Sequence, residues 1–375
     1  MLFHPTDFEE LTETAWHSER VRAAVRKIVA DAEEAFDHDG LWHSDERDLP
    51  YGESPLKDLY AGAAGIVLAL EALRRRGHAA VALDLAGAAL RTLELSEPDA
   101  EATSLFFGEA GISTVAYRLA PSQDLADRLF ARVTENMNND ANELMWGAPG
   151  TMLIAHAMRD WTGDPRWSDA WAKSAAEVRR RRENGLWTQH LGKSPPQHML
   201  GAAHGAVANQ LALLQGSPIE DARDVAELLE RTAVVEGPLA NWSTDVDLEL
   251  VHNGRIRVQW CHGAPGVVIA AAAYLPEELL LAGAELTWQA GPHGKGPGLC
   301  HGTAGNGYAL LKAFERTGDE LWLDRARRFA MHALEQADRR GRGYHALFTG
   351  DLGVALYAAD CLDARARFPV LDGLD

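Results

Sequence analysis

Cysteine is scarce in this chain, with three residues among 375, and long hydrophobic runs are missing. One of the longest apolar runs, residues 267–274, falls far short of the ~20 residues that a membrane-spanning helix needs. No apolar signal segment stands at the N-terminus. These absences argue against a disulfide-stabilised secreted scaffold and against a transmembrane protein, so we expect a cytoplasmic protein with reduced thiols.

Positive charge is also in short supply. Lysine and arginine number 36 against 55 acidic residues, which gives a formal net charge of −19 at pH 7. A chain of that sign repels polyanions, and we therefore expect no nucleic-acid partner. The sequence contains neither a glycine-rich ATP-binding loop nor an H-R-D string, so it has no kinase signature.

Two of the three cysteines stand in similar motifs, W-C-H-G-A-P-G (residues 260–266) and L-C-H-G-T-A-G (residues 299–305). Cys261, Cys300 and His301 offer two thiolates and an imidazole from separated loops. Such a set suits tetrahedral Zn²⁺, and three protein ligands leave the fourth position open, as in catalytic zinc sites. The alternative is a disulfide between the two cysteines, which a reducing compartment disfavours.

The third cysteine, Cys361, has a different setting. It lies in an apolar helical run without a histidine beside it. Free cysteine often fills space in a protein interior, so we expect Cys361 to be part of the core.

A repeated G-x-x-G string organises the chain. Each copy opens a run that is small and apolar nearly all round, as expected of a buried helix. Amphipathic segments lie between the copies, as expected of outer helices. The strings are residues 62–65, 108–111, 147–150, 205–208 (with Ala208 in place of the second glycine), 263–266, 302–305 and 350–353, and the amphipathic segments include residues 20–36, 124–135, 167–183, 220–232 and 320–337.

This alternation predicts an all-α fold, an α/α barrel (toroid) of seven outer–inner helix pairs, because repeats of this kind bury their faces only against neighbours. We expect residues 1–375 to form a single domain. The N-termini of the seven inner helices would converge at one end of the barrel, where a functional site is expected. Residues 248–260 depart from the pattern, since two β-prone runs flank Asn253-Gly254. They predict a short β-hairpin that delivers Cys261 from a strand.

Taken together, the motifs resemble the lanthionine synthetase C-like family over nearly the whole chain. W-C-H-G and K-G-P-G-L-C-H-G resemble its stand-alone eukaryotic-type branch. The other matching strings are D-L-Y-A-G-A-A-G from Asp58, N-E-L-M-W-G-A-P-G from Asn142, L-G-A-A-H-G from Leu200, L-F-T-G-D-L-G from Leu347 and A-R-F-P from Ala366. The resemblance implies a seven-fold α/α barrel with a zinc ion held by Cys261, Cys300 and His301.

The resemblance also implies roles for four other residues. His204 matches the family's catalytic histidine, and Glu143 matches the position of a catalytic aspartate, where it would act as an orienting group or a proton relay. Lys295 aligns with a lysine that helps bind glutathione, and His262 would hydrogen-bond a metal ligand or the substrate. Simpler interpretations remain open: a packed histidine, a carboxylate that favours the helix dipole, and a solvated lysine.

The activity that the resemblance implies is addition of a thiol to dehydroalanine or dehydrobutyrine, which forms a lanthionine-type thioether. The thiol would come from the same peptide, closing a ring, or from glutathione that reacts with a dehydrated protein. Because the sequence has no dehydratase or kinase signature, a separate dehydratase must prepare the substrate. A non-catalytic binding protein and an α/α-barrel glycosidase are the alternatives, and a glycosidase leaves the two C-H-G strings unexplained.

Overall fold

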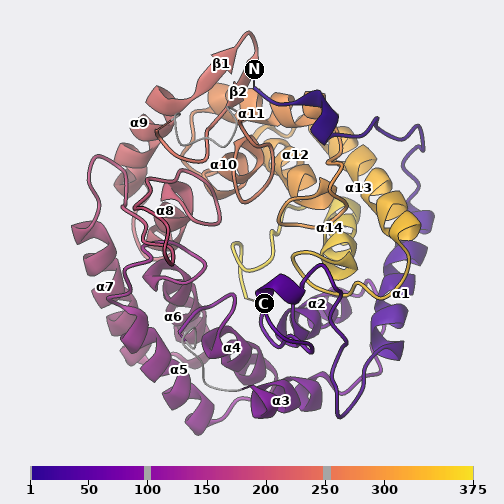
Figure 1. Ribbon diagram of the computed structural model, residues 1–375, viewed down its shortest axis with the longest axis vertical. Coiled ribbons are helices and arrows are strands. Elements are labelled where there is room, and N and C mark those ends of the chain that lie inside the picture. The colour runs from indigo at the N-terminus through magenta and orange to yellow at the C-terminus, as the bar shows by residue number, and fades with distance from the viewer. Residues whose placement is uncertain (1, 97–102, 248–254, 375) are drawn as a thin grey trace.

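The computed structural model describes residues 2–96, 103–247 and 255–374, which form two concentric rings of α-helices (Figure 1). Within these residues, seven outer helices alternate along the chain with seven inner ones, so the predicted α/α barrel is confirmed. The outer helices are α1 (Ser18–Glu34), α3 (Leu85–Leu95), α5 (Gln123–Asn136), α7 (Pro165–Arg180), α9 (Arg223–Thr232), α11 (Glu277–Ala290) and α13 (Glu320–Arg340). The inner helices are α2 (Ala63–Arg75), α4 (Glu109–Leu119), α6 (Ala148–Thr162), α8 (Ala206–Leu214), α10 (Ala264–Ala270), α12 (Thr303–Thr317) and α14 (Asp351–Asp363). Short 3₁₀ turns are η1 (Pro5–Asp7), η2 (Leu49–Tyr51) and η3 (Ile219–Ala222).

The pattern of burial explains which helices lie inside. The inner helix α14 buries every residue from Asp351 to Cys361, which places Cys361 in the core as predicted. The outer helix α9, in contrast, buries only Val225, Leu228 and Leu229, at the spacing of one helix face. None of the described helices has both the length and the apolar character needed to cross a bilayer.

Among the described residues, the strand predicted before Cys261 is absent, and the two-stranded sheet lies earlier in the chain. The two-stranded antiparallel sheet consists of β1 (Val234–Glu236) and β2 (Leu239–Asn241). Of the predicted range, residues 248–254 lie outside the described residues, and residues 255–260 form no strand. The strand expected to lead into W-C-H-G-A-P-G (residues 260–266) is therefore a loop; this string and L-C-H-G-T-A-G (residues 299–305) are the two candidate metal motifs.

Side-chain amides hold the backbone of this loop. The carbonyl oxygen of Arg257 accepts a hydrogen bond from Asn241 Nδ2 (3.2 Å), and that of Val258 accepts one from Asn306 Nδ2 (2.9 Å). A backbone carbonyl that is satisfied in this way needs no partner strand. The β-prone composition before Cys261 is therefore accommodated by two asparagines on other elements.

A series of backbone hydrogen bonds joins neighbouring repeats at the end of the barrel where the inner helices begin. The residues involved each stand two positions before the first glycine of a G-x-x-G string. The peptide N–H of one donates to the carbonyl oxygen of the next, in the order Ala203 to Cys261 (3.5 Å), Cys261 to Cys300 (3.2 Å), Cys300 to Phe348 (3.0 Å), Phe348 to Tyr60 (3.0 Å) and Tyr60 to Phe106 (3.1 Å). The two cysteines are neighbours in this series, so the repeat itself places them side by side.

Residues 365–374 return from α14 into the interior of the inner ring, where Figure 1 marks the C-terminal end. Phe368 is completely buried there. Its ring centroid lies 5.1 Å from that of Trp260 and 5.0 Å from that of Tyr308. Trp260 is the residue before Cys261, so this segment supports the metal motif from inside the barrel.

Lys312 holds the same segment to the inner ring. This lysine is buried on α12, and its Nζ donates to the carbonyl oxygen of Ala366 and to Asp372 Oδ1, both at 3.0 Å. A buried charge is tolerated when it is paired and hydrogen-bonded, as here. The contact anchors residues 365–374 to the barrel wall.

Candidate metal and catalytic site

The structure brings the three predicted metal ligands together. The Sγ atoms of Cys261 and Cys300 and a ring nitrogen of His301 lie within 4.8 Å of one another. Both cysteines are buried free thiols, which argues against the disulfide alternative, and His301 is half-buried. The cluster forms because the backbone N–H of Cys261 donates to the carbonyl oxygen of Cys300, with His301 following directly.

The donor set fits a zinc ion. Tetrahedral zinc binds thiolate sulfur at about 2.3 Å and imidazole nitrogen at about 2.0 Å, so neighbouring ligand atoms are separated by about 3.5 to 3.8 Å. The three atoms are within about an ångström of that spacing. A hydrogen bond between the two thiols lowers the pKa of Cys261 and raises the pKa of Cys300, which favours a pair with one negative charge. A divalent cation would favour loss of the second proton as well.

Gln259 links the predicted residue Lys295 to this cluster. Gln259 Nε2 donates to Cys261 Sγ (2.9 Å), and Lys295 Nζ donates to Gln259 Oε1 (3.2 Å). The lysine side chain is exposed, yet its charged end is tied to the metal motif. Sequence reasoning missed Gln259, although it stands four residues before its repeat glycine, as Glu143 does.

Tyr60 is a second contact that the sequence analysis missed. It is 3% exposed, and its hydroxyl shares a hydrogen bond with the Cys300 thiol. Burial raises the pKa of Tyr60 well above its usual range, so the phenol stays protonated and can donate to sulfur. Its place in the repeat, two residues before the first glycine, matches those of Cys261 and Cys300 and is the signal that could have found it.

His204 and Glu143 form a hydrogen-bonded pair. His204 Nδ1 lies 2.8 Å from Glu143 Oε2. The glutamate is completely buried and also accepts hydrogen bonds from the backbone N–H groups of Met145 (2.9 Å) and Trp146 (2.7 Å). A carboxylate in this position assigns the proton to Nδ1 and leaves Nε2 of the imidazole as a free acceptor. The arrangement is suited to acid–base chemistry at Nε2.

His262 lies between this pair and the cysteine cluster. Its ring centroid is 5.8 Å from that of His204, and Cys261 is its neighbour in the chain. The Nδ1 atom is buried and has no hydrogen-bond partner among the described residues. Burial lowers the pKa of His262 to about 4, so the imidazole is neutral at pH 7. The hydrogen bond expected from His262 to a ligand or substrate remains a prediction.

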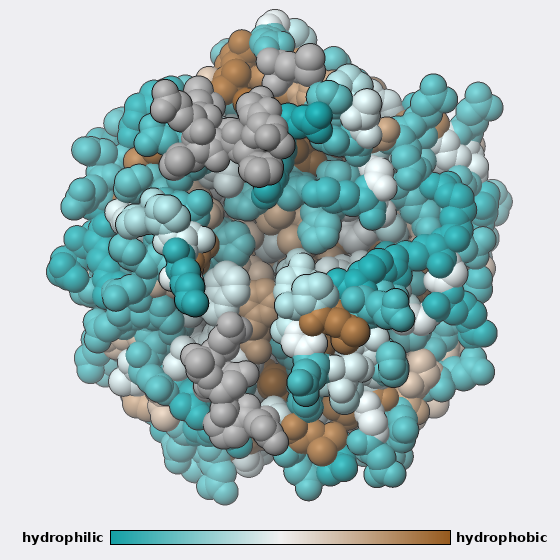
Figure 2. Space-filling view, viewed as in Figure 1, coloured by the Kyte–Doolittle hydropathy of each residue, from teal (hydrophilic) through white to brown (hydrophobic). Residues whose placement is uncertain are grey.

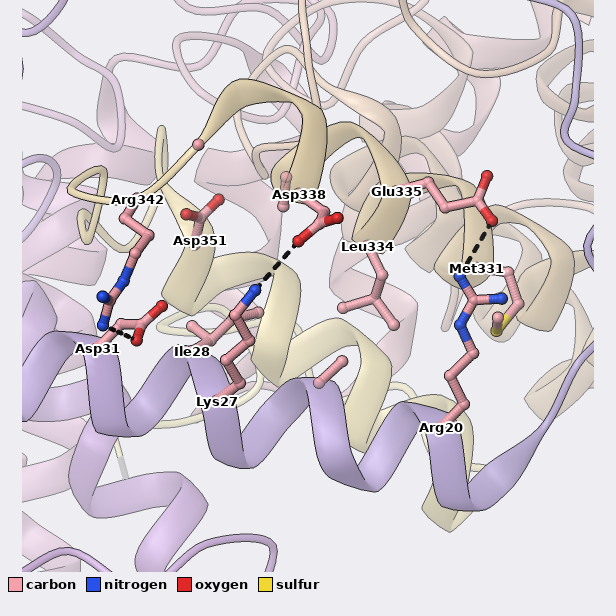
Figure 3. Close-up of a pocket in the computed structure, with 13 residues that line it drawn as sticks. Arg20, Lys27, Ile28, Asp31, Met331, Leu334, Glu335, Asp338, Arg342 and Asp351 are labelled. Carbon is pink, nitrogen blue, oxygen red and sulfur yellow. Dashed lines mark hydrogen bonds and ion pairs between the residues drawn. The ribbon is translucent and has the colours of Figure 1, made fainter.

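A cavity of about 230 Å³ between α1 and α13 contains none of these residues (Figure 3). Apolar side chains from both helices line it, among them Ile28 and Leu334. Three ion pairs cross it, namely Arg20 to Glu335 (3.4 Å), Lys27 to Asp338 (3.1 Å) and Arg342 to Asp31. The cavity is therefore a gap between two outer helices whose charged groups pair with each other, and it is separate from the candidate site.

Figure 2 shows the molecule along the viewing direction of Figure 1. This face is largely hydrophilic, in keeping with a net charge of −19, and its described hydrophobic residues form small separate groups. The surface is hollowed near its centre, over the inner ring of helices.

Two related chains are among those that comparison with curated proteins finds. Over 194 residues the chain is 33% identical to "Glutathione S-transferase LANCL1" of Danio rerio, and the match covers 47% of this chain and 46% of that protein. Over 88 residues it is 36% identical to "LanC-like protein GCL1" of Arabidopsis thaliana, with 21% and 20% covered. The matches therefore span less than half the length of these relatives.

Among solved structures, nisin cyclase superposes with a TM-score of 0.63 over 94% of this chain and 98% of its own, at 15% sequence identity. At that identity the likeness shows a shared fold. The family model for "Lanthionine synthetase C-like protein" matches residues 56–372, which is most of the sequence. The chain therefore belongs to the lanthionine synthetase C-like family.

Proposed function

We propose that this protein catalyses the zinc-dependent addition of a thiol to dehydroalanine or dehydrobutyrine in a peptide or protein, with formation of a thioether. The observation that carries the proposal is the proximity of two reactive groups at one end of the barrel. The first is the cluster of Cys261, Cys300 and His301, and the second is the His204–Glu143 pair. Membership of a family that includes thioether-forming cyclases supports this chemistry.

Cys261, Cys300 and His301 would hold the zinc ion, whose charge would lower the pKa of an incoming thiol and make thiolate available at neutral pH. Gln259 acts on the same site, because its amide N–H donates to Cys261 Sγ and so withdraws charge from that sulfur. Lys295, bonded to the other end of the amide, offers a cation to a carboxylate of the thiol substrate.

His204 would carry the protons. In the addition, a C–S bond forms at the β-carbon, the C=C π bond breaks, and the α-carbon takes up one proton while the thiol gives one up. Glu143 holds Nδ1–H of His204 at 2.8 Å, so Nε2 is free to accept the thiol proton and return it to the α-carbon. The proton balance closes without a further reagent.

The leading form of the reaction is ring closure by a cysteine of the same peptide. Glutathione addition is the second form. The exposed Lys295 beside the metal motif and the similarity to a protein named glutathione S-transferase both favour it. In either case we propose that a separate dehydratase supplies the dehydrated substrate. The alternative of a glycosidase is weaker, because the carboxylate of Glu143 is fully buried and held by three hydrogen bonds.

The test is mass spectrometry of a peptide that carries both cysteine and dehydroalanine. The peptide is incubated with zinc-loaded protein and glutathione and then treated with a thiol-alkylating reagent. Loss of the alkylatable thiol without a change in mass means ring closure, and a gain of one glutathione means intermolecular addition. Samples with and without protein that match across a panel of such peptides would contradict the proposal and favour a non-catalytic binding protein.

A further inference from the structure

In three consecutive repeats, the residue just before the first glycine of the G-x-x-G string lies at the candidate metal and catalytic site. In the fourth, fifth and sixth repeats this residue is His204, His262 and His301. The second and third repeats carry Phe107 and Trp146 at the same position, immediately before α4 and α6. Because these inner helices follow one another around the ring (Figure 1), the aromatic pair continues the row of histidines along one arc.

The ring distances show that this arc is continuous. The ring centroids of Trp146 and His204 are 5.6 Å apart and nearly parallel at 15°. Phe107 lies 4.9 Å beyond Trp146 at 25°, and Tyr51 lies 6.1 Å beyond Phe107 at 18°. An unbroken series of stacked rings therefore runs from the candidate acid–base residue to a tyrosine of η2.

Part of the surface of these three aromatic rings is exposed and does not pack in the core. Phe107 and Trp146 are half-buried, and Tyr51 is 44% exposed. Aromatic residues of the interior, such as Phe348 and Phe368, are in contrast completely buried. Partly exposed aromatic surface that adjoins a site is typical of a surface that binds a ligand.

We propose that Tyr51, Phe107 and Trp146 form a subsite for an apolar or aromatic side chain of the dehydrated substrate. The proposal rests on the proposed function, in which the dehydroamino acid lies at His204. An extended peptide advances about 3.3 Å per residue, so Trp146 would contact a side chain about two residues from the dehydroamino acid. Lys295, the cation proposed to bind the thiol substrate, is hydrogen-bonded through Gln259 to Cys261 of the fifth repeat. Trp146 belongs to the third repeat, so the two residues lie on opposite sides of His204, which belongs to the fourth.

The experiment compares two peptides, each of which carries one cysteine and one dehydroalanine. They differ only at the residue two positions from the dehydroalanine, which is phenylalanine in one peptide and serine in the other. Both peptides are incubated with the protein and glutathione. The rate at which dehydroalanine is lost, whether by ring closure or by glutathione addition, gives kcat/KM for each peptide. For the wild-type protein we expect a preference of about 10-fold for the phenylalanine peptide. Trp146→Ala and Phe107→Ala should each reduce this ratio towards one, and Trp146→Phe should retain most of it.

Trp161→Ala is the matched control, because this tryptophan stands in the last turn of α6, at the opposite end of the helix from Trp146, and the variant should keep both the rate and the preference. A second readout is the binding of the same two peptides, fluorescently labelled, to the zinc-loaded His204→Asn variant. Turnover of both peptides with a ratio near one would overturn the subsite and leave the proposed function standing. Absence of thioether from both peptides would overturn the proposed function, while a binding preference that depends on Trp146 would still support the subsite.

Discussion

His204 is fixed by a partner that solvent does not reach. Glu143, 61 positions earlier in the chain, has no exposed surface and uses its carboxylate to hold the imidazole and two backbone N–H groups. With both oxygens occupied, the carboxylate gives the imidazole one orientation and one tautomer. The sequence contains both residues, but only the folded chain shows that they touch.

Replacement of His204 by asparagine separates metal binding from proton transfer. The variant His204→Asn should form thioether on the order of 10²-fold more slowly, because the amide cannot exchange protons at neutral pH. Its zinc content should equal that of the wild type, because His204 is not one of the three proposed ligands. Rates from mass spectrometry and zinc from elemental analysis check this. A variant with unimpaired turnover would assign the proton transfer to another residue.

The loops that begin the inner helices explain why glycine recurs in the sequence. Of the seven first glycines, only Gly263 adopts a positive φ, at 103°. Close approach accounts for glycine elsewhere, as at Gly305, where a Cβ would overlap the carbonyl oxygen of Leu299. The position of the helices was therefore predictable from the strings. The loop before Cys261 was not predictable, because the asparagine side chains that hold the carbonyl oxygens of residues 257 and 258 come from other parts of the chain.

Neighbouring helices are also joined by charge. Glu109, the first residue of α4, is 3% exposed and accepts hydrogen bonds from Arg128 Nε (2.5 Å) and Arg132 Nη2 (3.1 Å) of α5. Burial by itself would raise the pKa of Glu109, but the two arginines outweigh it and lower the pKa from 4.5 to about 2. A carboxyl whose pKa is lower in the folded state stabilises the fold above pH 4.5, and this stability is lost as the pH falls towards 2.

The substitution Glu109→Gln should lower the free energy of unfolding at pH 7 by about 3 kcal/mol, and the difference from wild type should shrink as the pH falls towards 2. Glu135→Gln is the control, since it removes a more exposed contact with Arg132 and should cost less than about 1 kcal/mol. Urea titrations across this pH range measure both. A difference that stays constant between pH 7 and pH 3 would show that the ionised carboxylate is not the source of the stability.

The barrel as a unit has an interior that its helices do not fill by themselves. Phe368, on the segment after the last helix, packs against Trp260, the residue before Cys261. Its ring centroid lies 6.2 Å from that of Phe348. The carbonyl oxygen of Phe348 in turn accepts from the backbone N–H of Cys300 (3.0 Å). Both cysteines therefore rest on the cluster that Phe368 completes.

Phe368→Ala should lower the free energy of unfolding by about 3 to 5 kcal/mol and weaken zinc binding by about 10-fold or more, because the support behind both ligands is lost. Phe329→Ala removes an equally buried ring from the outer helix α13 and should cost similar stability. Its zinc affinity should equal that of the wild type. Chelator competition gives the affinities, and equal zinc affinities in the two variants would contradict this role of Phe368.

The sequence was sufficient for the topology and for the cluster of Cys261, Cys300 and His301, because repeated strings and cysteine–histidine motifs are local patterns. It was insufficient for contacts that depend on the closed ring. The contact of Tyr60 with Cys300, the bond from Lys295 to Gln259 and the packing of the segment around Phe368 all join parts of the chain that lie far apart in the sequence. Only the position in the repeat marks Gln259 and Tyr60, since glutamine and tyrosine also occur elsewhere in the chain, and Phe368 lies outside the repeated strings.

Zinc content distinguishes a metal site at Cys261, Cys300 and His301 from a cluster of free thiols. The purified protein should bind about one zinc ion per chain, and Cys300→Ala should lose it, because two remaining ligands hold the metal too weakly. Cys361→Ala removes a buried thiol of the core and should keep its zinc, which separates loss of a ligand from loss of packing. Zinc bound equally by the wild type and by Cys300→Ala would contradict the proposed metal site and the chemistry built on it.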